Sequence, residues 1–375
     1  MKLRKRIRNP FGRVSKERKS TWPCGAGSGK GDETMVTIKD ISRACGVSPA
    51  TVSKALNGYG DISAETVSLV KRTAKEMHYL PNAAARSLKT NTTHNIGVLF
   101  VDETSSGLTH EYFSMILNSV KEEAESHGYD ITFICQNLGG KTVSFLEHCR
   151  YRKCDGVVIA SVNFDSEPVH ELVHSEVPVV TIDYSFDNVS AVMSDNVEGS
   201  YELTKYLISL GHRKIGYVHG ETTSVTNKRM RGFFKALDDH GIETRDEYII
   251  QGRFHDPSCG TEATEILLSL SDPPTAIMYP DDYTYLGGMA ELRRRGLSIP
   301  EDISVTGYDG ISLSQVLTPA LTTWHQDAER IGKESVRKLI ETIENPRTCE
   351  PEQIMISGRL YSGYSVHRLV NEMRR

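Results

Sequence analysis

The sequence predicts an all-α headpiece of the helix-turn-helix type with a hinge helix. An α/β domain of two subdomains with parallel, doubly wound sheets follows it. Three observations support this fold class. The net charge is +7 over residues 1–34, +4 over 35–94 and −16 over the rest. Three short helical patterns begin at Thr37. From Ile96 onward, apolar runs alternate with amphipathic segments, and 375 residues suffice for several cores.

Residues 1–34 form a basic extension without apolar periodicity, and we expect it to be disordered. The stretch GAGSGKGD is similar to a phosphate-binding loop, but Cys24 and Gly31 stand where that pattern needs Gly and Ser or Thr. The codons of residues 30–32 form a purine-rich run that resembles a ribosome-binding site shortly before Met35. The hypothesis that follows is that residues 1–34 are translated upstream sequence, with Met35 as the natural start.

Residues 35–80 predict three short helices. Thr37 and Asp40 form a capping-box-like start for the first helix, which ends at Gly46. Ser48 is the predicted N-cap of the second helix, and Pro49 follows it at the first helical position. Ser63 is the predicted N-cap of the third helix. Two helices joined by a tight glycine-containing turn are typical of a helix-turn-helix. A small three-helix bundle without DNA-binding function would show the same periodicity.

The second of these helices has the features of a recognition helix. Pro49, Ala50 and Thr51 are compact at its outward N-terminal end, which lets the backbone approach the major groove. Lys54, one turn later, can reach a guanine edge or a phosphate, and Ala50 can meet a thymine methyl group. The positive charge of residues 35–94 fits a polyanion partner.

Residues 81–94 predict a short helix and linker. Leu88 stands between Arg86 and Lys89, a composition that suits an apolar wedge in the minor groove held by cations on the phosphates. An interdomain linker helix is the plainer interpretation. Such a helix is too short to be stable alone in water, so a partner must order it.

From residue 95, buried strands spaced by helices predict two parallel sheets, and ligands of such sheets bind at the carboxyl ends of the strands. Asp183, Asp281, Asp282 and Asp309 stand at those ends. If they face one cleft, the hydroxyl groups of a polyhydroxy ligand can donate to them, and Arg229 can balance their charge. Helix capping is the alternative role for polar residues at such positions.

Two motifs compete with a binding function. His170-Glu-Leu-Val-His174 matches the HExxH zinc-peptidase pattern, but a strand follows after four residues and no third ligand is evident. Asp281 and Asp309 could flank a glycosidic bond, as in a hydrolase. A hydrolase gains nothing from an attached DNA-binding headpiece, so we expect no catalytic residue, metal or cofactor. A solute-binding protein joined to an unrelated tail is the remaining alternative.

The motifs together resemble a known family. Val36 to Asn57, VTIKDISRACGVSPATVSKALN, and His78 to Lys89, HYLPNAAARSLK, are similar to the headpiece and hinge of the lactose-repressor (LacI/GalR) family of bacterial transcription regulators, and the likeness continues to about Leu360. The resemblance implies a homodimer that binds a pseudopalindromic double-stranded operator and a small effector. It implies DNA contacts at Thr37, Ser48, Pro49, Ala50, Thr51, Ser53, Lys54, Asn57, Asn82, Ala85, Arg86, Leu88 and Lys89, with Leu88 intercalating.

The same resemblance implies a periplasmic-binding-protein-like effector domain. Its first subdomain would comprise residues 95–194 plus 327–356 and its second 195–326 plus 357–375, with chain crossings near 194, 326 and 357. Thr223 and Val225 depart from the Arg and Thr of the purine-repressor pattern, which favours a sugar or sugar derivative. The implied effector contacts are Tyr112, Phe113, Asp183, Asp195, Arg229, Phe254, Asp281 and Asp309.

The sequence also predicts where the protein acts. Its longest apolar runs, Ile96 to Val101 and Val177 to Val180, are far shorter than the roughly 18 residues of a membrane span. The seven cysteines are widely spaced without a CxxC pair, which is typical of free thiols in a reducing compartment. We therefore expect a cytoplasmic, nucleoid-associated protein with no membrane partner.

Overall fold

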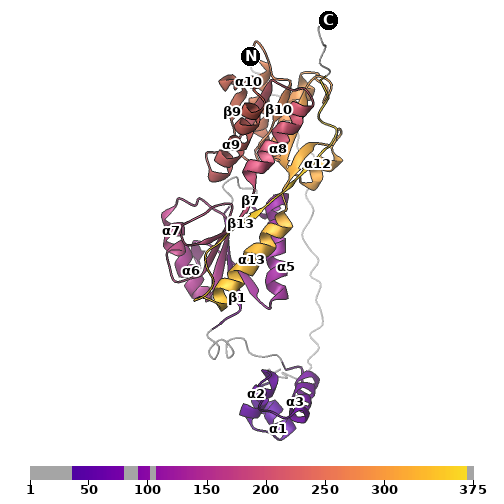
Figure 1. Cartoon of the computed structure of the whole chain (residues 1–375). Coiled ribbons are helices and arrows are strands. Elements are labelled where there is room, and N and C mark those ends of the chain that lie inside the picture. The colour runs from indigo at the N-terminus through magenta and orange to yellow at the C-terminus, as the bar shows by residue number, and fades with distance from the viewer. Residues whose placement is uncertain (1–35, 80–91, 102–106, 370–375) are drawn as a thin grey trace, which may run out of the picture. The chain divides into compact units, whose positions relative to one another are not determined.

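A computed structural model describes residues 36–79, 92–101 and 107–369 of the chain (Figure 1). The chain divides into two compact units, one up to Asn82 and one from Ala83 onward. The extension 1–34 and the predicted hinge residues Asn82, Ala85, Arg86, Leu88 and Lys89 lie outside the described residues. Among the described helices, none is both long and apolar enough to cross a bilayer.

The first unit contains three helices: α1 (Ile38–Cys45), α2 (Pro49–Leu56) and α3 (Ala64–Glu76). Asp40 closes the start of α1, because its carboxylate accepts from the backbone N–H of Thr37 at 2.9 Å and from the Thr37 hydroxyl at 2.6 Å. Gly46 ends α1 with φ of 66°, a left-handed conformation that glycine adopts at little cost. The buried core consists of Ile41, Val52, Ala55, Val70 and Ala74. The predicted helix-turn-helix is thereby confirmed.

The second unit contains two six-stranded sheets. In the first sheet the strand order is β13-β7-β6-β5-β1-β2, and all neighbours are parallel. Its strands are β1 (Asn95–Phe100), β2 (Asp130–Ile134), β5 (Gly156–Ser161), β6 (Val179–Ile182), β7 (Ser190–Ser194) and β13 (Gln353–Ile356). Helices α5 (Glu111–Ser126) and α13 (Ala328–Glu344) cover one face, and α6 (Phe145–Arg152) and α7 (Glu167–Val173) cover the other (Figure 1). Because both faces are covered, the central strands are continuously apolar.

The second sheet has the order β14-β12-β11-β10-β8-β9. Its strands are β8 (Ile215–His219), β9 (Ile249–Gln251), β10 (Ala276–Met278), β11 (Ser304–Asp309), β12 (Thr322–His325) and β14 (Arg359–Tyr361). Helices α8 (Asn196–Ser209) and α9 (Ser224–Asp239) pack on one face, and α10 (Pro257–Leu268) and α11 (Asp282–Arg294) on the other. Short segments complete the unit: η1 (Gly107–Thr109), β3 (Asn137–Leu138), β4 (Lys141–Thr142), η2 (Asp246–Tyr248) and α12 (Ser312–Val316).

The structure refines two expectations about this unit. The second sheet is not wholly parallel, because β14 runs antiparallel to β12 at its edge, and β3 and β4 form a separate antiparallel pair. Helix α13 was not predicted from the sequence. The chain passes between the two sheets from β7 to α8, from β12 to α13 and from β13 to β14. Three connecting segments thus join two halves that have separate cores.

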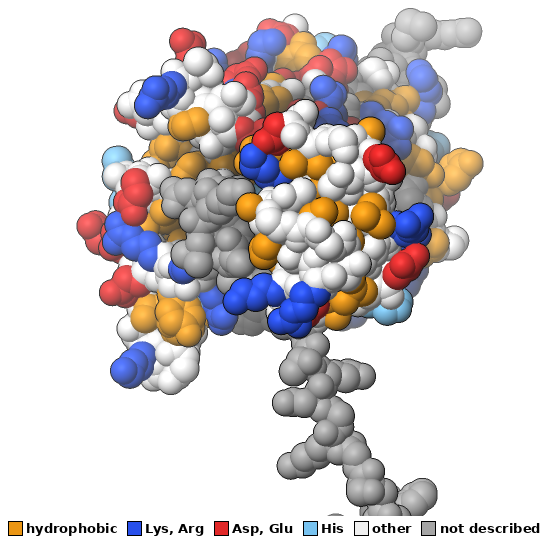
Figure 2. Space-filling model, turned by 90° about the horizontal axis from the view of Figure 1, so that it is seen from below, with side chains coloured by type: hydrophobic (Ala, Val, Ile, Leu, Met, Phe, Trp, Pro, Cys, Tyr) orange, Lys and Arg blue, Asp and Glu red, His pale blue; other side chains and the backbone are white. Residues whose placement is uncertain are grey.

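The face of the molecule seen in Figure 2 is mixed in charge. In the view of Figure 2, Lys and Arg side chains lie interspersed with Asp and Glu side chains, and hydrophobic side chains occur between them.

All the cysteines of the described residues are free, and Cys149 and Cys259 are buried. This agrees with the expected free thiols.

Candidate functional sites

Helix α2 presents one face to the core of the first unit and the other to solvent. Val52 and Ala55 are fully buried, whereas Pro49, Ala50 and Lys54 are exposed. This separation leaves a compact, solvent-facing N-terminal end, as a helix that enters a DNA groove requires. The described residues among the predicted DNA contacts all retain access to solvent: Thr37, Ser48, Pro49, Ala50, Thr51, Ser53, Lys54 and Asn57.

Side-chain hydrogen bonds fix the shape of this helix. The Ser48 hydroxyl accepts from the backbone N–H of Thr51 at 3.1 Å, which caps the start of α2. At its end, the Asn57 side chain donates to the carbonyl oxygen of Ser53 at 2.6 Å. The Lys54 ammonium group forms an ion pair with Asp61, which lies in the turn after the helix. The Lys54 cation is therefore held by a carboxylate of its own unit, a contact that the sequence did not indicate.

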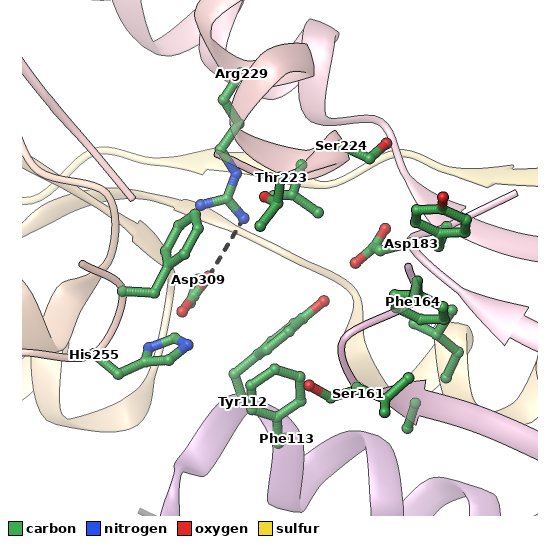
Figure 3. A pocket seen from close by; sticks show the side chains of 16 residues that line it. Tyr112, Phe113, Ser161, Phe164, Asp183, Thr223, Ser224, Arg229, His255 and Asp309 are labelled. Carbon is green, nitrogen blue, oxygen red and sulfur yellow. Dashed lines mark ion pairs between the residues drawn. The ribbon is translucent and has the colours of Figure 1, made fainter. Parts of the chain in front are cut away.

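The second unit contains a cavity of about 190 Å³ between its two sheets (Figure 3). The first half contributes residues of α5 and of the ends of β5 and β6 with the segments after them, and the second half contributes α9, the segment after β9 and the last residue of β11. The cavity is thus at the carboxyl ends of the strands, where the fold class places ligands. It is lined by Tyr112, Phe113, Ala160, Ser161, Val162, Phe164, Ile182, Asp183, Tyr184, Thr223, Ser224, Val225, Arg229, Phe254, His255 and Asp309.

Arg229 is the buried cation of this cavity. Its Nε donates to Asn196 at 2.7 Å and one Nη donates to the carbonyl oxygen of Pro280 at 2.8 Å. The guanidinium carbon lies 3.6 Å from the ring centroid of Tyr308, a cation–π contact. The other Nη lies 3.9 Å from Asp309 (Figure 3). Burial disfavours its charge, but Tyr308 and Asp309 outweigh burial and raise the pKa of Arg229.

Asp183 and Asp309 face Arg229 and the aromatic wall from the ends of β6 and β11. Both have left-handed backbones, with φ of 57° and 96°, a conformation that non-glycine residues adopt at a cost and that clusters at functional sites. Asp183 accepts from the backbone N–H of Ser194 at 2.7 Å, and Asp309 from the Gln326 side chain at 2.7 Å. Burial raises the pKa of Asp183 and raises that of Asp309 to about 6.

Aromatic rings form the walls on either side of these charges. Tyr112 projects into the cavity next to Phe113, and the two ring centroids are 5.3 Å apart (Figure 3). The rings of Phe164 and Tyr184, which also line the cavity, stack at 4.5 Å and are nearly parallel. Flat apolar faces beside carboxylates and a guanidinium suit a ligand that has both a flat face and hydroxyl groups.

Six of the eight predicted effector contacts line the cavity, and Asp195 and Asp281 do not. Asp195 caps α8, because it accepts from the backbone N–H of Glu198 at 2.9 Å. Asp281 caps α11, accepting from the N–H of Thr284 at 2.7 Å and from the N–H of His255 at 2.8 Å, and it is fully buried. In this structure both carboxylates are therefore helix caps, the alternative role considered for polar residues at strand ends. Their acceptor positions are taken by helix and loop N–H groups.

The fourth carboxylate at the strand ends, Asp282, is also structural. It accepts from the Thr323 hydroxyl at 2.7 Å and from the backbone N–H of Ile311 at 2.9 Å. It is 2% exposed and does not line the cavity. Burial raises its pKa well above the ordinary value.

The competing catalytic motifs do not form sites. The carboxylate pair proposed for a glycosidase is broken up, because Asp281 caps a helix instead of facing the cavity. His174 has its Nδ1 at 2.8 Å from the carbonyl oxygen of His170, within their own helical segment. Within the described ranges, the group of side chains placed to hold a metal is His110, His255 and Asp309, not the HExxH pair.

Several cavity residues were not predicted. His255 and Tyr184 directly follow the predicted Phe254 and Asp183, so adjacency to a strand end was the available signal. Two residues outside the cavity lining hold Arg229 in place: Tyr308 by a cation–π contact and Asn196 by accepting a hydrogen bond. The sequence offers no signal for that packing, because these residues come from separate elements.

A helix-turn-helix unit joined to a hinged domain with a polar and aromatic cavity defines a ligand-controlled, DNA-binding transcription regulator. Comparison with known families gives the same result. Residues 37–82 match "Bacterial regulatory proteins, lacI family", and residues 93–364 match "Periplasmic binding proteins and sugar binding domain of LacI family". The chain belongs to the LacI family of bacterial regulatory proteins. It is therefore a transcription regulator and not a hydrolase or a free solute-binding protein.

Individual relatives agree with this assignment. The chain is 36% identical to the HTH-type transcriptional repressor PurR of Pasteurella multocida, over 82% of this chain and 92% of that protein. It is 35% identical to the PurR repressor of Mannheimia succiniciproducens, over 89% and 100%. Among solved structures it is similar to the lac repressor dimer bound to operator and the anti-inducer ONPF (TM-score 0.72, 25% identity, 89% and 100% coverage). It is also similar to a CelR–cellobiose complex (TM-score 0.64, 26% identity, 88% and 99%).

Proposed function

We propose that this chain is a repressor that binds a pseudopalindromic operator as a homodimer. A small ligand, a sugar or sugar derivative, controls its operator affinity. The observation that supports this proposal is the cavity, because both halves of a hinged domain build it around two carboxylates, a guanidinium and aromatic walls. Operator binding also implies that the protein acts in the cytoplasm, at the nucleoid.

The proposed DNA contact is made by α2 and by the segment that follows the headpiece. Pro49, Ala50 and Lys54 are exposed on one side of α2 and would meet base edges, whereas Thr37, Ser48, Thr51, Ser53 and Asn57 would hold the phosphates. Within residues 81–94, Leu88 would be the minor-groove wedge, with Asn82, Ala85, Arg86 and Lys89 around it. In a homodimer, two such headpieces read two half-sites.

The chemistry of the cavity favours a neutral polyhydroxy ligand. Asp183 and Asp309 accept hydrogen bonds, and a sugar supplies hydroxyl donors for both. Arg229 already donates to Asn196 and Pro280, and its remaining Nη faces Asp309, so the cavity has little positive charge to offer a phosphate. Tyr112 and Phe113 provide a surface on which the flat face of a sugar ring packs. Solved relatives bind cellobiose and ribose.

Control of DNA binding follows from the construction of the domain. We assign residues 95–194 plus 327–356 to one half and 195–326 plus 357–375 to the other, with three connecting segments as the hinge. A ligand that contacts both halves stabilises their closed arrangement by its differential affinity for that arrangement. If closure changes how the two first halves of a dimer sit together, it changes the spacing of the headpieces and thus the operator affinity.

A thermal-shift screen of the full chain against sugars, phosphosugars and nucleobases tests the proposal. A true ligand at a hundred times its Kd stabilises the folded state by about 2.7 kcal/mol. Each hit is then added to a fluorescence anisotropy titration on operator DNA obtained by selection from a random pool. The sign of the affinity change distinguishes an inducer from a corepressor. Stabilisation by phosphosugars or nucleobases alone would contradict the neutral-sugar assignment.

A further inference from the structure

His110, His255 and Asp309 meet beside the cavity, although they come from three separate places in the fold. His110 directly precedes α5 in the first half, whereas His255 follows β9 and Asp309 ends β11 in the second half. One nitrogen or oxygen atom of each lies within 4.8 Å of the others. We propose that these three side chains bind a first-row transition-metal dication, such as Zn²⁺ or Co²⁺, that joins the two halves of the domain.

The donor set is the first argument. Two imidazoles and one carboxylate are ligands that Zn²⁺ and its neighbours prefer, and three protein ligands leave a coordination position for water or a ligand. Ligand atoms of a tetrahedral zinc site lie about 3.3 Å apart, as bonds of about 2.0 to 2.2 Å require. The ring centroids of His110 and His255 are already 3.7 Å apart. Side-chain rotation or a small closure of the cleft would complete the site.

The surroundings of His255 are the second, independent argument. A metal-bound histidine normally donates its other ring N–H to a carboxylate, which fixes the tautomer and the ring orientation. Here Nδ1 of His255 faces Oδ2 of Asp281 at 3.7 Å, longer than a hydrogen bond, and a small rotation of the ring would complete that contact and leave Nε2 for an ion. Asp281 is itself held by the backbone N–H and the hydroxyl of Thr284, at 2.7 and 2.9 Å.

Aromatic side chains enclose the other histidine. The ring of His110 lies 4.8 Å from that of Tyr283 and 5.5 Å from that of Phe113, and the residue is 2% exposed. Such an apolar shell limits solvent access to a metal site and strengthens its electrostatics. The buried carboxylates Asp281 and Asp309 lie beside the two histidines, and Arg229, 3.9 Å from Asp309, balances part of their negative charge; a dication would balance the rest.

An ion at this site would have two consequences. It would favour the closed arrangement, because its ligands come from both halves, and it would compete with any other ligand for Asp309. The site does not depend on the sugar assignment. A screen carried out with a chelator tests the sugar response alone.

The test uses the full chain after removal of metal with a chelator. Co²⁺ is titrated in while its visible absorption is recorded, and Zn²⁺ is then used to displace it. His110→Gln and His255→Gln remove the proposed ligands with similar side-chain volume. His170→Gln is the matched control, because His170 lies on α7, next to His174 at the end of that helix, and does not line the cavity. Circular dichroism of the metal-free variants checks that each is folded.

The expected result is one Co²⁺ per chain with an intense tetrahedral-type spectrum. The Co²⁺ affinity of each cavity variant should fall at least tenfold, because loss of a residue that merely hydrogen-bonds to a metal ligand already lowers metal affinity by about that factor. The control should bind as the natural chain does, and Zn²⁺ should raise the thermal midpoint of the natural chain and of the control but not of the cavity variants. Absence of a bound ion, loss of binding in the His170→Gln control alone, or a sulfur-to-cobalt charge-transfer band would each overturn the proposal.

Discussion

Replacing Asp309 with Asn should make the protein more stable while it loses its response to the ligand. Asp309 is 5% exposed, and burial raises its pKa from 3.8 to about 6 although Arg229 lies 3.9 Å away. A carboxyl group with a raised pKa binds its proton more tightly in the folded state, so folding penalises the ionised form. At 1.36 kcal/mol per pKa unit, the penalty is about 3 kcal/mol above pH 6. Asn keeps the acceptor for Gln326 without the charge.

The expected gain at pH 7.5 is about 1 to 3 kcal/mol, since Arg229 loses part of its compensating charge in the variant. The sign of the pH dependence follows from linkage. The penalty of the natural chain is fully present above the folded pKa and disappears as the pH falls through 6 toward 3.8, so the gain should shrink to roughly a third at pH 4.5.

Urea denaturation measures this effect, followed by the tryptophan fluorescence to which the buried Trp324 contributes. Asp327→Asn is the control, because Asp327 caps α13 by accepting from the N–H of Arg330 at 3.0 Å and Asn caps helices equally well. A destabilised Asp309→Asn variant at pH 7.5 would refute the reasoning, as would a gain that does not change with pH. Either result would mean that the attraction between Arg229 and Asp309 outweighs the cost of burial.

Four further variants separate the two functions of the chain. Arg229→Ala should abolish the ligand response and leave operator affinity nearly intact, as thermal shift and anisotropy titrations would record; a full response would contradict the cavity assignment. Lys54→Ala should lower operator affinity by roughly 1 to 3 kcal/mol without affecting ligand binding. Asp61→Asn frees Lys54 from its ion pair, so it should raise operator affinity severalfold and steepen the salt dependence of binding. Leu88→Ala should weaken operator binding by a few kcal/mol, the scale of unstacking a base step, and unchanged footprints would contradict the wedge.

The carboxylates at the strand ends show what a local sequence pattern does not predict, namely the role of each side chain. Asp183, Asp195 and Asp281 follow strands and Asp309 ends one, and the sequence around them gives no signal that separates their roles. The backbone distinguishes them. Asp183 and Asp309 have positive φ, whereas Asp281 and Asp195 have φ of −160° and −75°, from which the carboxylate reaches the first N–H groups of the next helix. The same residue type at the same kind of position is therefore a cavity wall in one case and a helix cap in the other.

The sequence by itself determined the elements whose signals are local. Capping residues, a glycine turn and apolar periodicity define the headpiece, and apolar runs between helices define the two sheets. Only the tertiary structure decided which side chains are in contact. Examples are the ring contact between His110 and His255 and the cation–π contact between Arg229 and Tyr308. The physical reason is that helix and strand formation depends on neighbours within a few residues. The direction of a side chain across a cleft depends instead on how separate elements pack.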